Sequence, residues 1–203
     1  MYEFHQLDDN GDIFYLKNSF TVPEKYLEFL EEMDLNKDSY SYIEKWRDWT
    51  ASNDNSNIYG SQKHINDIKV LSKDQYLNKK ILYLINAIKE PLIMCSTKYL
   101  FDKAMGIPTK INSFAINKYY PGKSMGPHID SYGESDKKRF TLLIYLNENY
   151  DGGEIEFPNQ NIKLKPEAGS VLIFPTCQPF VHRSYEIFSG NKYFVLAEFG
   201  IEE

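Results

Sequence analysis

Two residues able to bind a metal stand one position apart in the stretch Ser124–Gly133, which reads SMGPHIDSYG. If this stretch is a strand, alternating side chains place His128 and Asp130 on one face, about 6 to 7 Å apart. One metal ion can bridge that separation. A capping aspartate beside a buried histidine would also explain an H-x-D pair, so the pair alone leaves both interpretations open.

Of the other three histidines, one has a context that suits metal binding. His5 lies in an expected terminal strand and His64 in a polar loop, and neither has a carboxylate at ligand spacing. His182 lies in VHRSYEIF, on an expected strand that antiparallel connections can bring beside His128. Two histidines and one carboxylate on one face are the ligand set associated with non-haem Fe(II), which leaves coordination positions open. Affinity alone would favour zinc at the same ligands.

Composition favours one domain over residues 1–203, because 42% hydrophobic and 15% aromatic residues supply a sizeable core. Cys95 and Cys177 are too few for a disulfide framework and form no C-x-x-C pair, so we expect core thiols in a reducing, cytoplasmic setting. The N-terminus lacks a leader pattern, and no segment reaches the roughly 18 apolar residues of a membrane span. No membrane partner is therefore expected.

The net charge of −6 argues against a surface that follows nucleic-acid phosphates. A local basic cluster, DKKRF at Asp136–Phe140, is the exception. A nucleic-acid partner is not expected.

The first half of the chain predicts a hairpin and helices. Asp9-Asn10-Gly11 indicates a type I′ hairpin between the strands around it, and Pro23–Met33 has helical spacing of apolar residues. A second helix is expected from a capping box at Ser72, with Pro91 ending or kinking it, and Pro91–Gly106 would form a third. The polar segment Arg47–His64 is either a surface loop or a mobile substrate lid.

From Lys110 onward, short apolar runs alternate with turn residues, which is typical of a sandwich or barrel. The expected strands are INSFAINKYY, FTLLIYLN, EIEF, NIKLK, VLIF and YFVLAEF. FTLLIYL is almost continuously apolar, as a strand covered on both faces would be. We therefore predict an α+β fold, a jelly roll over residues 110–203 with the hairpin and helices of residues 1–109 packed on one outer face.

Longer motifs in this half resemble the 2-oxoglutarate and Fe(II)-dependent oxygenases, in particular their prolyl 4-hydroxylase-like branch. The motifs occur in order between Asn117 and Phe199, as NKYYPGKSMGPHID, RFTLLIYLNENYDGGEIEFP, LKPEAGSVLIFP and HRSYEIFSGNKYFVLAEF. The resemblance implies a double-stranded β-helix, in agreement with the strands expected above. The first 110 residues resemble the family only in the expected order of a strand followed by a helix.

The resemblance also implies the chemistry. His128, Asp130 and His182 would bind Fe(II), 2-oxoglutarate would chelate the iron through its C1 carboxylate and C2 keto oxygens, and O₂ would take the remaining position. Oxidative decarboxylation to succinate would then drive hydroxylation of a substrate C–H bond.

The far carboxylate of 2-oxoglutarate needs a cation, and the resemblance implies Lys192, ten residues after His182. Because lysine offers a point charge rather than a fork of donors, hydroxyl groups are expected to complete the binding of the carboxylate. Tyr119 and Thr141 occupy positions where the prolyl hydroxylases have such groups. Arg183 is the next candidate for the cation.

For the substrate, the resemblance implies that Arg139 lies at the pocket mouth. The period of two along the last strand places Glu198 on the face of Lys192, where relatives often carry an aromatic residue. Glu198 either reaches solvent through a bulge or pairs with Arg139 or with a basic group of the substrate. Trp49 or Tyr59 would cover the pocket if their segment is a lid.

Three functions remain open on the sequence. The first is hydroxylation of a peptide or protein, with a peptidyl proline as the default. The second applies the same iron chemistry to a free amino acid, another small molecule or a nucleobase. The third is a cupin-like binding module without catalysis, which the complete ligand set and Lys192 disfavour.

Overall fold

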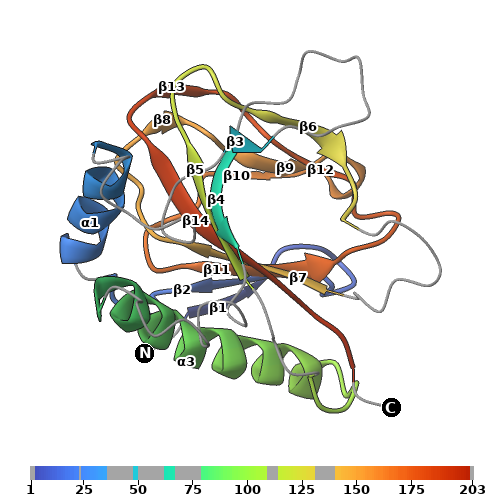
Figure 1. Cartoon of the computed structure of the whole chain (residues 1–203). Helices are drawn as coiled ribbons and strands as arrows, with labels where there is room; N and C mark the ends of the chain where they lie inside the picture. Colours follow the sequence, from blue (N-terminus) through green and yellow to red (C-terminus); the bar gives the residue numbers. More distant parts are fainter. Residues whose placement is uncertain are drawn as a thin grey trace.

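The structure, a computed structural model, describes residues 3–22, 24–35, 48–49, 62–66, 79–108, 114–130 and 140–201. Within these residues the chain forms fourteen strands, which pair antiparallel, and two α-helices, α1 and α3 (Figure 1). None of the described helices has the length and apolar character needed to cross a bilayer.

A large sheet forms the body of the molecule. Its strands, in spatial order, are β1 (Glu3–Gln6), β2 (Phe14–Lys17), β11 (Val171–Pro175), β7 (Phe140–Tyr145), β14 (Lys192–Phe199), β5 (Phe114–Tyr119), β4 (Gln62–Asn66) and β3 (Asp48–Trp49). All six residues of β7 are buried, as its continuous apolar sequence predicts. The strands expected from Lys110 onward are therefore confirmed.

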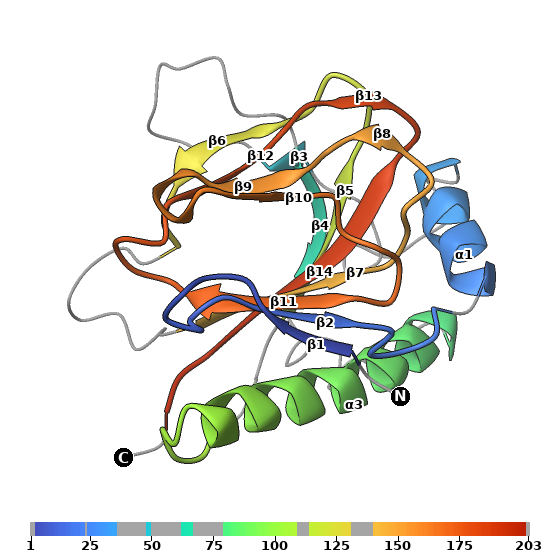
Figure 2. The same ribbon diagram turned by 180° about the vertical axis from the view of Figure 1, so that it is seen from behind.

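A smaller sheet faces the large one. It contains β10 (Ile162–Leu164), β9 (Ile155–Phe157), β12 (His182–Ser184) and β6 (Met125–His128), while β13 (Ile187–Ser189) pairs with β8 (Asp151–Gly152). A short 3-10 helix, η2 (Pro158–Gln160), joins β9 to β10. Figure 2 shows the smaller strands as a separate layer opposite β11, β7 and β14. Facing antiparallel sheets are the jelly-roll arrangement that the sequence predicts.

Side chains alternate along each strand of the large sheet, so the sheet contributes to two cores. Leu143, Tyr145 and Phe194 belong to the core between the sheets. Leu142, Ile144 and Val195 belong to the outer core, which also contains side chains of α1 (Glu24–Leu35) and α3 (Lys79–Asp102). The inner core surrounds the residues described below.

The structure corrects the expected division of α3 into two helices. Pro91 lies inside one continuous helix, and Ser72 lies outside the described residues. A proline inside a helix costs about 3 kcal/mol because it removes a hydrogen bond and crowds the preceding turn. Burial of Ile88, Leu92, Cys95 and Tyr99 along one face, at roughly 1.5 to 3 kcal/mol each, outweighs that cost.

The first hairpin is confirmed, but its turn is not type I′. Only Gly11 of the turn has positive φ, at 62°, whereas a type I′ turn needs two such residues. Asp8 Oδ1 accepts the backbone N–H groups of Asp12 and Ile13, both at 2.7 Å, and this closes a longer loop. The aspartate side chain therefore replaces the tight turn.

Two further expectations are wrong. His64 lies in strand β4, opposite Asn117 of β5, and not in a loop. Cys177 is exposed and not a core thiol, whereas Cys95 is buried and burial raises its pKa to about 12. The rest of Arg47–His64 apart from β3 and β4 lies outside the described residues.

Candidate metal centre

Two neighbouring strands of the small sheet supply the histidines. β6 ends at His128, β12 begins at His182, and these two residues are directly opposite each other in the antiparallel pair. Asp130 lies in the bend after β6, not on the strand as the spacing argument assumed. The bend carries the carboxylate back toward both rings, and the backbone N–H of Asp130 donates to the carbonyl of Thr176 at 3.1 Å.

The three side chains converge on one point. Asp130 Oδ1 lies 3.4 Å from His128 Nε2 and 3.7 Å from His182 Nε2. One ligand atom from each residue lies within 4.8 Å of the others. This clustering supports the prediction, made from the sequence, that His128, Asp130 and His182 bind a metal ion.

Backbone contacts fix the orientation of both rings. His128 Nδ1 lies 2.8 Å from the carbonyl of Gly126, and His182 Nδ1 lies 3.2 Å from that of Phe180. Because a carbonyl only accepts hydrogen bonds, each Nδ1 carries a proton, and Nε2 is the ring nitrogen that faces Asp130. When both rings are neutral, these three residues offer three electron-pair donors to one point, as a divalent cation requires.

Burial and charge act in opposite directions at this cluster. Burial lowers the pKa of His182 to about 4, so this ring is neutral at pH 7. Burial alone would raise the pKa of Asp130, but hydrogen bonds from His128 and Thr141 and the charges of the imidazoles lower it. The result is an ionised carboxylate beside a neutral imidazole, which is the protonation state of metal ligands.

Thr141 supports Asp130 from the large sheet. Its hydroxyl, fully buried on β7, donates to Asp130 Oδ2 at 2.5 Å. The sequence predicts this hydroxyl as a partner of 2-oxoglutarate, which stays a prediction, and the structure shows its contact with the carboxylate of Asp130. A hydrogen bond from a neighbouring side chain is a common way to orient a metal-binding carboxylate.

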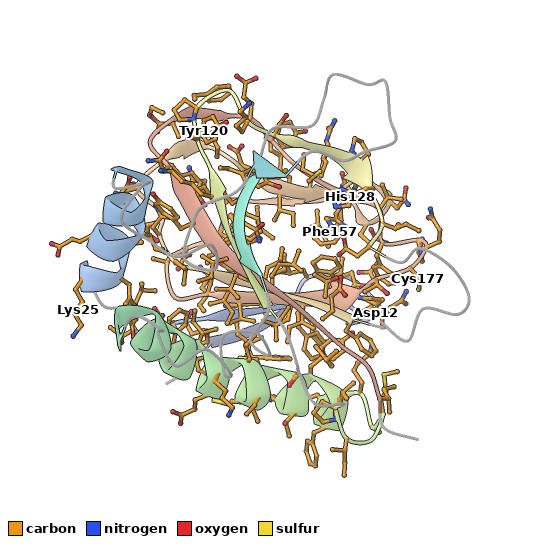
Figure 3. The ribbon with its side chains drawn as sticks, in the orientation of Figure 1. Asp12, Lys25, Tyr120, His128, Phe157 and Cys177 are labelled. Carbon is orange, nitrogen blue, oxygen red and sulfur yellow. The ribbon has the colours of Figure 1, made fainter. Side chains whose placement is uncertain are left out.

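Aromatic rings form the wall around His182. Its ring centroid lies 4.7 Å from that of Phe174 on β11 and 5.6 Å from that of Phe157 on β9. Figure 3 shows His128 and Phe157 at the end of the small sheet where β6 ends, on the same side of the molecule as Cys177. Rings from both sheets therefore limit the access of water to His182.

Lys192 occupies the inner core at the start of β14. The residue is 2% exposed, and its Nζ donates to the carbonyl of Gly153 at 2.6 Å and to Ser184 Oγ at 3.2 Å. Burial and, to a smaller extent, the charge of Lys165 lower its pKa to about 7, against the opposing effect of Glu154. A buried ammonium of this kind is poised to gain a carboxylate partner.

Tyrosines surround this ammonium. Tyr119, which pairs with Lys192 across β5 and β14, has its ring centroid 5.9 Å from Nζ. The centroids of Tyr145 and Tyr150 lie at 5.4 Å and 5.9 Å. Within the described chain the hydroxyls of Tyr145 and Tyr150 are buried and make no hydrogen bond. Sequence reasoning missed both, although a period of two from Thr141 along β7 places Tyr145 on the inner face.

Arg183, the second candidate for the cation, is engaged elsewhere. Its Nε donates to Glu156, and its Nη2 donates to the hydroxyl of Tyr185 at 2.6 Å. These side chains lie on the half-exposed outer face of the small sheet. The structure therefore favours Lys192 as the inward cation.

The predicted substrate residues are described only in part. Glu198 is half-buried and shares the inner face of β14 with Phe194 and Leu196. Trp49 lies in β3, opposite Gln62, but its side chain is outside the description. Arg139 and Tyr59 lie outside the described residues.

Comparison with known proteins agrees with this geometry. Residues 114–197 match the model of the 2OG-Fe(II) oxygenase superfamily. A PKHD-type hydroxylase of Prochlorococcus marinus strain MIT 9215 is 32% identical over 99 residues, which cover 46% of this chain and 44% of the relative. A PKHD-type hydroxylase of strain NATL1A is 26% identical over 185 residues, covering 88% and 74%.

A solved structure shows the same fold. A prolyl hydroxylase from Trichoplax adhaerens, in complex with a peptide of hypoxia inducible factor, has a TM-score of 0.64 and 19% identity, and the match covers 93% of this chain and 83% of that one. Apart from the NATL1A protein, the chain spans about half the length of the curated relatives it matches, for example 44% and 53% of two of them. The resemblance drawn from the sequence is confirmed.

Proposed function

We propose that this chain, whose residues 114–197 belong to the 2OG-Fe(II) oxygenase superfamily, hydroxylates an aliphatic C–H bond of a peptidyl prolyl residue with Fe(II), 2-oxoglutarate and O₂. The observation that carries the proposal is the convergence of His128, Asp130 and His182 within 4.8 Å. Two imidazoles and one carboxylate suit Fe(II) and leave positions for a chelating cosubstrate and O₂. Once bound, the iron would supply the oxidation chemistry.

The protein's own residues hold and orient the ligand set in this proposal. The carbonyls of Gly126 and Phe180 hold Nδ1 of each ring and so direct each Nε2 at the metal position. Thr141 holds one oxygen of Asp130, which leaves Oδ1 for the metal. Because these partners are fixed before any ligand arrives, little reorganisation is needed on binding.

The position of Lys192 supports binding of 2-oxoglutarate. Lys192 contacts Ser184, two residues beyond His182 on β12, and the Cα atoms of these two β12 residues are about 7 Å apart along the strand. This span is comparable with the length of a five-carbon dicarboxylate. The far carboxylate would bind the ammonium, with the hydroxyls of Tyr145 and Tyr150 as further donors.

The choice of a peptide substrate rests on the relatives. The Trichoplax protein is a prolyl hydroxylase bound to a peptide, and the likeness to it at 19% identity extends to the fold. A free amino acid, another small molecule or a nucleobase is the second candidate, since the described inner face carries a carboxylate, Glu198, near the metal ligands. In either case the chain acts as a single domain, with α1 and α3 supporting the large sheet from outside.

Anaerobic loading with Fe(II), followed by air and 2-oxoglutarate, tests the reaction. We expect release of succinate and CO₂ by the wild-type protein, and stimulation of that release by a proline-containing peptide that gains one oxygen atom. His182→Ala serves as the inactive control. Succinate release without any oxidised peptide across a proline peptide array would shift the proposal to the small-molecule candidate, and no succinate at all would refute it.

A further inference from the structure

We propose that Asn147 is a positioning residue, which fixes the Lys192 ammonium at the place where the far carboxylate of 2-oxoglutarate would bind. The inference rests on the proposed function and adds a supporting residue to its cosubstrate site. Asn147 follows the end of β7 and is 4% exposed, so its carboxamide makes its contacts inside the protein.

The carboxamide of Asn147 binds the backbone on both sides of Lys192. Its Oδ1 accepts the backbone N–H of Tyr193 at 2.7 Å, and its Nδ2 donates to the backbone carbonyl of Asn191 at 2.6 Å. Because a backbone N–H only donates and a carbonyl only accepts, these two partners determine which end of the amide carries the oxygen. One side chain therefore holds both peptide neighbours of Lys192.

These hydrogen bonds replace strand pairing at the point where β7 leaves the sheet. β7 ends two residues before Asn147, and the backbone N–H of Leu146 donates to the carbonyl of Tyr193 at 2.9 Å. Beyond Leu146, the Asn147 carboxamide presents to β14 the acceptor and the donor that a peptide group of a longer strand would present. On its other edge Lys192 pairs with Tyr119 of β5. The start of β14 is thus held from both sides.

Asn147 also holds the loop on which the turn before β14 packs. Its Nδ2 donates a second hydrogen bond, to Asn149 Oδ1 at 2.7 Å. A Cβ atom on Gly190 (φ +74°) would lie 2.7 Å from the carbonyl oxygen of Asn149 and 3.0 Å from Tyr150 Cα, so the turn and the loop are in close contact. The turn that leads into Lys192 is therefore fixed through the same side chain.

The contacts of the ammonium depend on this backbone. Lys192 Nζ donates to the carbonyl of Gly153 at 2.6 Å and to Ser184 Oγ at 3.2 Å, and the residue is 2% exposed. A group that must meet a ligand in one geometry is sensitive to small movements, and a displacement of about 1 Å can cost roughly 100-fold. Loss of the Asn147 carboxamide should therefore weaken carboxylate binding although Asn147 itself does not touch the ligand.

Calorimetric titration of 2-oxoglutarate into the Fe(II)-loaded protein under argon tests the inference. We compare the wild type, Asn147→Ala, Asn147→Asp and Tyr99→Phe. The aspartate keeps an acceptor for Tyr193 but loses both hydrogen bonds that Nδ2 donates. The control, Tyr99→Phe, removes a long-range hydrogen bond to the carbonyl of Asp12 at 3.0 Å, from a buried side chain of the outer core. If the alanine variant does not fold, Asn147→Ser takes its place, because a hydroxyl can serve only part of this set of partners.

Both Asn147→Ala and Asn147→Asp should raise the Kd of 2-oxoglutarate by about tenfold or more, while the Kd of Fe(II) stays within about threefold. Tyr99→Phe should leave both constants within about twofold. A double-mutant cycle with Lys192→Met separates positioning from general loosening of the fold. In the Lys192→Met background Asn147→Ala should change the Kd of 2-oxoglutarate by less than about threefold, since no ammonium is left to position.

A second measurement needs neither metal nor cosubstrate. Titration of the ¹⁵N-lysine-labelled, metal-free protein by NMR follows the Lys192 amine, whose signal is identified by its absence in Lys192→Met. Burial lowers the pKa of Lys192 to about 7. In Asn147→Ala the less constrained ammonium should reach solvent, so its pKa should rise by about one pH unit or more, whereas Tyr99→Phe should leave it unchanged.

The two measurements also separate this inference from the proposed function. An unchanged titration of Lys192 in Asn147→Ala, a Kd of 2-oxoglutarate within about threefold of the wild type, or an equal loss of affinity in the Lys192→Met background would overturn the inference. If the wild type binds no 2-oxoglutarate and releases no succinate but the Lys192 titration depends on Asn147, the oxygenase proposal fails and the placement of Lys192 by Asn147 stands. If 2-oxoglutarate binds and neither measurement depends on Asn147, the inference alone fails.

Discussion

Replacement of Lys192 by methionine should stabilise the protein and at the same time weaken its binding of 2-oxoglutarate. Burial lowers the pKa of this lysine from 10.5 to about 7, which means that the folded state disfavours its proton. Below pH 7 the folded protein holds a buried ammonium whose nearest partners are a carbonyl and a hydroxyl. Methionine has a similar length and no charge, so it removes that cost.

The magnitude follows from the change in pKa. A displacement from 10.5 to about 7 corresponds to a penalty on the order of 4 to 5 kcal/mol when both folded and unfolded chains are protonated. Loss of the hydrogen bonds to Gly153 and Ser184 offsets roughly 1 to 3 kcal/mol of the gain. A net stabilisation of about 1 to 4 kcal/mol is therefore expected at pH 6.

The sign of the pH dependence is fixed by proton linkage. Between pH 7 and pH 10.5 the unfolded chain binds a proton at this lysine and the folded chain does not, so the stability of the wild type rises with pH. Methionine does not titrate. The advantage of Lys192→Met should therefore shrink by about 3 kcal/mol between pH 6 and pH 9.5.

Cosubstrate binding should change in the opposite direction. Loss of the charge partner of a buried carboxylate costs about 2 to 4 kcal/mol, or roughly 30-fold to 1,000-fold in the 2-oxoglutarate concentration needed. In the wild type the apparent Kd should rise above pH 7, by up to about tenfold per pH unit, because the neutral amine must first gain a proton. In Lys192→Met this rise should be absent.

Urea unfolding at pH 6, 8 and 9.5 and calorimetric titration of 2-oxoglutarate measure both effects. Lys163→Met is the matched control, since Lys163 is exposed on β10 and its ammonium lies over the ring of Tyr185. An equal change in stability at all three pH values would refute the argument that Lys192 is buried with a lowered pKa. Unchanged 2-oxoglutarate affinity would place the cation of the cosubstrate site elsewhere.

Three further substitutions test the centre itself. Asp130→Ala should abolish succinate release while circular dichroism stays that of the folded protein, because the jelly-roll core does not depend on this side chain; turnover by the folded variant would exclude Asp130 as a ligand. Thr141→Val should weaken Fe(II) binding about 10-fold to 100-fold and Thr141→Ser should restore most of it, as a hydrogen bond that orients Asp130 requires; equal affinity in all three proteins would assign Thr141 a packing role. Gly153→Ala should lower the melting temperature, since its Cβ would lie 2.4 Å from Ile187 Cδ1 at a φ of +70°; a wild-type melting curve would contradict this close packing.

The metal centre could be predicted from the sequence because it depends on local spacing and on strand pairing. His128 and His182 are opposite each other in adjacent strands, as the antiparallel connection predicts. The assumed geometry of Asp130 was nevertheless wrong, because β6 ends at His128. A bend with a backbone hydrogen bond to Thr176 brings the carboxylate closer than a continuous strand would.

In the first half of the chain, tertiary contacts decided the structure where the local sequence predicted a helix end and a tight turn. Pro91 predicts an end or a kink, yet the apolar stripe continues on both sides of it, and the gain from burying that stripe exceeds the cost of one proline. Asp8 determines the first turn through two hydrogen bonds from Asp12 and Ile13 that no dipeptide rule includes. Such contacts depend on side-chain direction and were not predictable from residue type.

The surroundings of Lys192 required the structure for the same reason. Alternation along β14 predicts its face but not its neighbours, which come from β5, β7 and the segment before β9. Burial without a carboxylate partner in the described chain explains both the lowered pKa of Lys192 and the unbonded hydroxyls of Tyr145 and Tyr150. A polar group left in this state destabilises the free protein, and a ligand that satisfies all three would regain that free energy on binding. The same contacts therefore account for a cost in stability and for the carboxylate binding that we propose at this end of the inner core.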